Sequence, residues 1–180
     1  MNDIYKCDLY RYYGNQPIPI LHKLLPSPEL KYLKLLRTAQ DSHGLIKKVN
    51  SLRLITMQRK TCIQIPYQTK IGKGFYIGHF GRIIINPGVI IGNNCNIATG
   101  VTIGQTNRGK SKGIPVIGNC VWIGTNAVIV GGITIGDDVL IAPNSYVNTD
   151  IPSHSVVMGN PAAIYPRENA TIAYINNRVE

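Results

Sequence analysis

Residues able to take part in a reaction are few in this chain, and one histidine and one basic loop stand out. His79 lies within a run of regularly spaced aliphatic residues. A neutral imidazole can accept a proton at neutral pH, because its ordinary pKa is about 6.5. The loop at residues 105–113 (QTNRGKSKG) carries Arg108, Lys110 and Lys112, whose cations could meet phosphates or an anionic substrate. A packing histidine and a solvated loop are the alternatives. The other histidines, expected to be structural or solvent-facing, are His22, His43 and His154.

The overall charge points to the same kind of partner. A formal net charge of +10 in 180 residues predicts attraction to phosphates on a cofactor, a polyanion, a membrane or nucleic acid. No nucleic-acid-binding motif is present, so we expect no nucleic acid partner and at most peripheral membrane association. The N-terminus lacks the apolar core of a secretory signal, which favours a cytoplasmic location. The four cysteines form no CxxC pair, which favours free thiols and no bound metal.

A six-residue repeat sets the framework that must position these residues. Aliphatic side chains recur every six residues, each followed in most cases by a small residue. Such hexads predict a triangular coil of about 18 residues per turn, with the aliphatic side chain pointing inward. A β-sandwich would instead show strands spaced by about 8–12 residues. We therefore predict a mainly β, parallel β-helix. The clearest run comprises Ile117, Ile123, Ile129, Ile135, Ile141 and Val147.

The repeat does not cover the whole chain. Residues 1–60 read as a small N-terminal helical cap, with apolar residues at helical spacing over 28–40 and 45–57. Such a cap would cover the first coil, whose unpaired strand edges could otherwise recruit another chain. The β-helix is expected over 61–163, interrupted by the protruding loop 105–113. Residues 164–180 form a C-terminal tail that gives no clear secondary-structure signal.

Several motifs of the repeat region resemble a known family. The segments are KIGKGFYIGH (70–79), GVTIG (100–104), VIGNCVWIG (116–124) and GNPA (159–162). They resemble the serine acetyltransferase branch of the hexapeptide-repeat acyltransferases. The resemblance implies a left-handed coil, transfer of an acetyl group from acetyl-CoA to a hydroxyl, and a homotrimer with active sites between subunits.

The same resemblance assigns roles to individual residues. It implies that His79 is the general base that takes the proton of the attacking hydroxyl. Arg108 and Lys110 would meet the phosphates of CoA. Acetyl-CoA in similar enzymes lies along the coil corners, where the matching positions are Gly124, Thr125, Pro143, Thr149 and Arg167.

The acceptor-binding positions depart from the family pattern. Serine acetyltransferases have Asp just before the catalytic histidine, where this chain has Gly78. Their Arg-His pair before the end of the loop is replaced by Gly113 and Ile114, and a further family Asp aligns with Gln64. The charged groups expected to hold serine are therefore missing, which favours a sugar hydroxyl.

These observations leave three functional hypotheses. We expect an O-acetyltransferase of surface-polysaccharide synthesis that acts on a small-molecule or lipid-linked sugar. Tyr76 and Phe80 would then offer an aromatic surface to the sugar, with packing against the cap as the commoner explanation. Asp8 is a candidate acceptor-binding carboxylate or a helix N-cap. Serine O-acetylation is the alternative among enzymes, and a non-catalytic β-helix scaffold is the alternative outside them.

Overall fold

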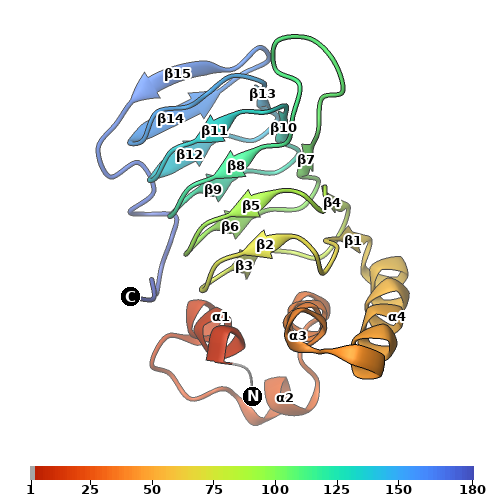
Figure 1. Cartoon of the computed structure of the whole chain (residues 1–180). Coiled ribbons are helices and arrows are strands. Elements are labelled where there is room, and N and C mark those ends of the chain that lie inside the picture. Colours follow the sequence, from red (N-terminus) through yellow and green to blue (C-terminus); the bar gives the residue numbers. More distant parts are fainter. Residues whose placement is uncertain (1–2) are drawn as a thin grey trace.

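The computed structural model describes residues 3–180, and it begins with four helices at one end of the molecule (Figure 1). These are α1 (Asp3–Tyr13), α2 (Ile20–Leu24), α3 (Pro28–Asp41) and α4 (Gly44–Thr61). Pro28 suits the first turn of α3 because that turn needs no amide donor. Leu30, Leu33 and Leu36 then bury one face of the helix. The left-handed conformation of Cys62 ends α4 and starts the first strand.

The rest of the chain winds into parallel coils that form three sheets. The β1 sheet has the order β1-β4-β7-β10-β13, the β2 sheet β11-β8-β5-β2, and the β3 sheet β15-β14-β12-β9-β6-β3. The strands of the β1 sheet are β1 (Ile63–Gln64), β4 (Ile83–Ile85), β7 (Thr102–Gly104), β10 (Val128–Val130) and β13 (Tyr146–Val147). Those of the β2 sheet are β2 (Lys70–Ile71), β5 (Ile90–Ile91), β8 (Val116–Ile117) and β11 (Thr134–Ile135). Those of the β3 sheet are β3 (Tyr76–Ile77), β6 (Asn96–Ile97), β9 (Trp122–Ile123), β12 (Val139–Ile141), β14 (Ser155–Met158) and β15 (Ala163–Pro166).

The hexad aliphatic residues stack directly above one another inside this prism. Ile77 pairs in register with Ile97, and Ile97 with Ile123. Each of these three side chains is at most 1% exposed. Full burial of such a side chain stabilises the fold by about 1.5–3 kcal/mol, so the ladders hold the coils together. The predicted parallel solenoid is confirmed, with about 5 turns.

One loop and one tail interrupt the regular winding. The predicted loop leaves after β7, closed at its base by an antiparallel bridge between Thr106 and Gly113. After β14 the chain reverses into β15, which pairs antiparallel with β14. The remaining residues run back along the coils towards α1, so that the C-terminus lies near the helical end (Figure 1). None of the helices within residues 3–180 is long and apolar enough to cross a membrane.

Candidate active site

His79 lies at an exposed corner of the first coil, between β3 and β4. Gly78 before it donates its amide to the carbonyl of Ile97 at 2.9 Å, which ties the corner to the second coil. Gly81 has a φ of 136°, and a Cβ there would overlap Oγ1 of Thr99. The backbone around His79 is therefore fixed by close stacking, while the imidazole itself faces solvent.

The same corner of the later coils places other predicted residues in line with His79. Because β3, β6, β9 and β12 pair in register, the residues two positions after the last paired isoleucine of each strand are also aligned from coil to coil. We call the resulting line the corner row. Its members are His79, Thr99, Thr125 and Pro143. Of the residues predicted to contact acetyl-CoA, Thr125 belongs to this row, Gly124 directly precedes it in the chain, and Pro143 lies one coil further on.

Gly124 is required by the stacking of these coils. Its amide donates to the carbonyl of Ile141 at 2.8 Å. A Cβ at this position would lie 2.7 Å from the nitrogen of Pro143, closer than real Cβ contacts. The absence of a side chain at Gly124 thus permits close contact between these coils.

The basic loop and Thr149 lie at a different corner. Thr149 follows β13. Through the pairing of β7, β10 and β13, its position corresponds to the start of the loop after β7, two coils earlier. This corner joins the β1 sheet to the β2 sheet, whereas the corner row joins the β3 sheet to the β1 sheet. Arg108 and Lys110 are both exposed there. Within one chain the loop therefore lies at the C-terminal ends of the strands of the β1 sheet, and His79 lies at their N-terminal ends.

Arg167 lies near neither the corner row nor the corner that carries the basic loop and Thr149. It follows β15, and its amide donates to the carbonyl of His154 at 2.7 Å. That contact lies beside the first residue of β14, at the opposite end of the strand from the corner row. Arg167 and Pro143 are therefore separated by the length of a strand.

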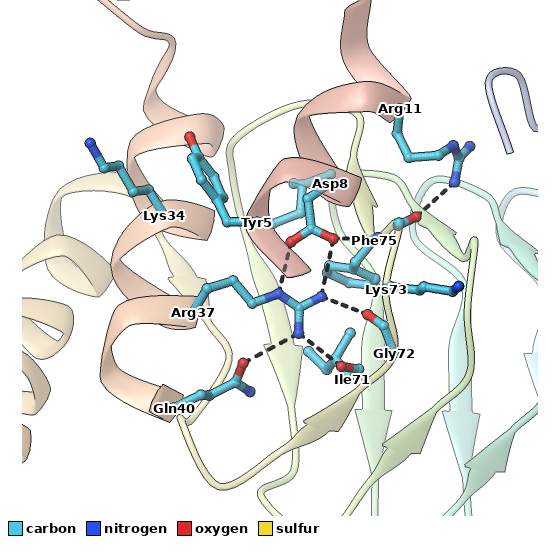
Figure 2. Close-up of polar contacts among 12 residues, drawn as sticks. Tyr5, Asp8, Arg11, Lys34, Arg37, Gln40, Ile71, Gly72, Lys73 and Phe75 are labelled. Atoms are coloured by element: carbon cyan, nitrogen blue, oxygen red, sulfur yellow. Dashed lines mark hydrogen bonds and ion pairs between the residues drawn. The ribbon is translucent and has the colours of Figure 1, made fainter. Parts of the chain in front are cut away.

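Asp8 lies in the interior, between α1, α3 and the first coil (Figure 2). Its side chain is 0% exposed, and its two oxygens accept hydrogen bonds from Nε of Arg37 at 2.8 Å and from Nη2 at 3.2 Å. The amide of Phe75 donates to it at 2.8 Å. Burial raises the pKa of the Asp8 carboxyl, and the bonds from Arg37 and Phe75 oppose that rise.

These contacts correct both expectations for Asp8. Its oxygens are engaged within the fold, so the carboxylate is not presented to an acceptor. It also lies in the middle of α1, so it is no helix N-cap. Asp8 and Arg37 instead join the helices to the coil.

The two aromatic candidates have different environments. Tyr76 packs against Tyr12 with ring centroids 4.3 Å apart. The hydroxyl of Tyr12 accepts from the amide of Ile77 and donates to its carbonyl, both at 2.9 Å. Tyr76 thus contributes to packing between α1 and β3. Phe80, beside His79, is 56% exposed.

Sequence reasoning missed the groups that dock the helices and the tail. Asp138 accepts hydrogen bonds from the amides of Ala170 and Thr171, from Oγ1 of Thr171, and lies 3.0 Å from Nδ1 of His154. Burial acts to raise the pKa of Asp138, but the bonds from Thr171 and His154 outweigh it and lower the pKa. Arg37 could have been suspected, because it lies seven residues after Leu30 on the same helical face. The tail contacts had no sequence signal.

Residues 3–180 contain no group of three or more His, Cys, Asp or Glu placed to hold a metal ion. The cysteines of this part of the chain are free thiols. Burial raises the pKa of the Cys95 thiol to about 12, which keeps it protonated and unreactive.

Comparison with known proteins identifies the repeats. A family model described as the hexapeptide repeat of succinyl-transferase matches residues 68–105, and one described as bacterial transferase hexapeptide (six repeats) matches 114–149. A serine acetyltransferase of Helicobacter pylori is 39% identical over 102 residues, which cover 57% of this chain and 60% of the relative. Soybean serine acetyltransferase in complex with serine has a TM-score of 0.76 at 27% identity, covering 91% of this chain and 68% of the soybean chain.

This chain carries hexapeptide repeats and is similar to serine acetyltransferases in sequence and in fold. A serine acetyltransferase solved with CoA is also similar, with a TM-score of 0.76 and 26% identity over 91% of this chain and 68% of that one. The likeness to these left-handed β-helices confirms the predicted fold class. The chain spans 60% of the length of the Helicobacter relative.

The expectation of a sugar acceptor is wrong. The relatives and solved structures reported above are serine acetyltransferases. The sugar hypothesis relied on side chains that are missing at Gly78, Gly113 and Ile114. Missing side chains remove expected contacts with serine, but they supply no contact with a sugar.

Proposed function

We propose that this chain is an acetyl-CoA-dependent serine O-acetyltransferase in which His79 is the general base. The observation that carries the proposal is the exposed imidazole of His79 at the head of the corner row. Its ring makes no hydrogen bond within residues 3–180, so its nitrogens are open to an incoming hydroxyl. The similarity to serine acetyltransferases solved with serine and with CoA supports the choice of both substrates.

The proposed reaction needs one proton carrier and a thioester held beside it. His79 takes the proton from the serine hydroxyl as its oxygen attacks the thioester carbonyl of acetyl-CoA. The resulting tetrahedral oxyanion requires hydrogen-bond donors. On its collapse the carbon–sulfur bond breaks, the imidazolium returns the proton to the leaving CoA sulfur, and O-acetylserine is released.

CoA would lie along the corner row. Thr125 is partly exposed there and carries only a small side chain, which suits the approach of the pantetheine arm. The cations of Arg108 and Lys110 lie on an exposed loop that could reach the phosphates of CoA. Pro143 has no amide hydrogen, so it could contribute only its carbonyl and its surface.

We also propose a homotrimer. Within one chain the loop and His79 lie at opposite ends of the strands of the β1 sheet, so one chain does not bring them together. Packing of solenoids side by side would set the loop of one subunit beside the corner row of the next. A closed ring of heterologous contacts would give each of three subunits the same site. Light scattering of the purified protein would reveal three chains, whereas an active monomer would refute the arrangement.

Serine also requires partners for its carboxylate and ammonium groups. Arg82 is exposed and lies on the same corner as His79, just before β4. We propose that it binds the serine carboxylate. Replacing Arg82 with Ala should raise KM for serine with little change in KM for acetyl-CoA. An unchanged KM for serine would remove Arg82 from the acceptor site.

An acceptor panel tests the proposed substrate. Release of CoA from acetyl-CoA is followed with L-serine, D-serine and N-acetylglucosamine as separate acceptors. We expect turnover above the hydrolysis background with L-serine and little with the other two. Turnover confined to the sugar would contradict the proposal, and background release with every acceptor would favour a non-catalytic scaffold.

A further inference from the structure

The outer face of α4 is apolar although nothing in the described chain covers it. The inner face of the helix buries Asn50 and Leu54. The opposite face presents Leu45, Val49 and Leu52, which are 76%, 53% and 68% exposed. Their spacing of four and three residues aligns them in one stripe along the helix. We call these three residues the outer stripe.

Cations flank the outer stripe. Helix α4 contains no Asp or Glu. At 100° per residue, Lys48 and Arg59 fall on one side of the stripe, while Arg53 and Lys60 fall on the other. All four residues are exposed. The helix therefore combines exposed apolar side chains with exposed cations and carries no acidic residue, a combination that suits contact with an anionic lipid surface.

The neighbouring parts of the helical end share this character. Helix α2 has no buried residue. Its apolar side chains are 63–76% exposed: Ile20, Leu21 and Leu24. A hollow of about 510 Å³ lies between α3 and α4. Its lining includes the apolar side chains of Leu35 and Met57 and the cations of Lys34 and Arg53. Figure 1 shows α2, α3 and α4 together at the helical end of the solenoid, away from the loop.

We propose that the outer stripe and its basic edges dock the protein on an anionic lipid surface. Apolar side chains at the stripe would enter the boundary between headgroups and acyl chains, while the cations contact lipid phosphates. A nucleic acid would use the cations but not the stripe. A second copy of the chain would place the same basic edges against each other, which like charges disfavour. This inference does not depend on the proposed acyl transfer.

The test is sedimentation of the full chain with lipid vesicles. One set contains phosphatidylcholine alone, and the other contains phosphatidylcholine with phosphatidylglycerol. We expect binding to the anionic set only, weakened by added salt because screening reduces the attraction of exposed charges. The variant Lys48→Glu/Arg53→Glu should bind the anionic set at least about tenfold more weakly.

The apolar contribution is tested separately. The variant Leu45→Ser/Val49→Ser/Leu52→Ser should also bind at least about tenfold more weakly, because it removes apolar area from the contact. Ile172→Ser/Tyr165→Ser serves as the matched control, since both residues are exposed, at 66% and 51%, but lie in the tail segment. Circular dichroism confirms that each variant is folded.

Three outcomes would overturn the proposal. The first is equal binding of the parent chain to both vesicle sets, or binding to neither. The second is an unchanged affinity of the stripe variant, which would reduce the contact to charge alone. The third is a lower mass of the stripe variant in analytical ultracentrifugation, which would assign the stripe to contact with a second copy.

Discussion

Arg37 and Asp8 form a fully buried, two-pronged ion pair that joins α3 to α1. Arg37 also donates to the carbonyls of Ile71 at 2.8 Å and Gly72 at 2.6 Å, which extends the contact to the first coil (Figure 2). The guanidinium of Arg37 on α3 thus binds both the carboxylate on α1 and backbone carbonyls of the first coil. Because the corner of His79 belongs to that coil, the pair also supports the candidate site.

Removal of one partner of this pair should destabilise the fold strongly. Asp8→Ala leaves the charge of Arg37 buried without a counter-ion, and we expect a loss of about 3–5 kcal/mol in the free energy of unfolding. The double variant Asp8→Leu/Arg37→Met should lose much less, because it buries no uncompensated charge. Urea denaturation measures both. Equal losses in the two variants would show that the pair acts through packing and not through charge.

The tail should detach in acid. The lowered pKa of Asp138 means that its ionised form is favoured by folding. Its contribution is present above the unfolded pKa of about 3.9 and is lost as the pH falls through the still lower folded value. Trp122, the single tryptophan, packs against Tyr174 of the tail with ring centroids 5.0 Å apart. Its fluorescence should therefore change below about pH 4.

A pair of variants isolates the carboxylate in that transition. Asp138→Asn should shift the change in Trp122 fluorescence or abolish it, since an amide does not titrate. Asp137→Asn alters the adjacent residue, which contacts Asn119 and not the tail, and should leave the transition in place. An identical acid transition in all three proteins would assign tail release to other groups.

Two glycines of equivalent corners should respond oppositely to a methyl group. At Gly124 the new Cβ would collide with Pro143, and we expect Gly124→Ala to cost about 1–3 kcal/mol. At Gly78 the nearest atoms would lie at an ordinary 3.7 Å, so Gly78→Ala should be neutral or stabilising by up to about 1 kcal/mol. Thermal denaturation compares them. Equal stability of the two variants would contradict the close coil contact at Gly124.

The space at Gly78 also permits a test of acceptor recognition. The resemblance to serine acetyltransferases implies an Asp at this position, directly before the histidine that we propose as the general base. The Cβ of Gly78→Asp would make only ordinary contacts, and we expect the new carboxylate to interact with the ammonium group of serine. We expect KM for L-serine to fall several-fold, which corresponds to about 1 kcal/mol. An unchanged KM, with Gly78→Ala as the control, would show that this position does not face the acceptor.

Much of the fold could be predicted because the repeat is visible in the spacing of residues that lie close together in the sequence. The hexads define which side chains point inward, and the observed α3 and α4 coincide with the helical patterns over 28–40 and 45–57. The loop at 105–113 was visible because it breaks the six-residue period. Each of these features depends on residues close together in the chain.

The contacts that hold the site in place could not be predicted in the same way. The partner of Asp8 lies 29 residues away on another helix, and Asp138 meets Thr171 across 33 residues. Periodicity shows which face of an element is buried but not which element covers it. The acceptor was misjudged for a related reason, since the sugar hypothesis was drawn from absent side chains.

The most direct test of the central claim is the turnover of acetyl-CoA with L-serine by His79→Ala. His43→Ala is the matched control, because His43 is exposed and its side chain makes no capping bond to α4. We predict that His79→Ala lowers kcat about 10²–10⁴-fold while the control keeps the parent rate. Equal rates in His79→Ala and the parent chain would contradict the account.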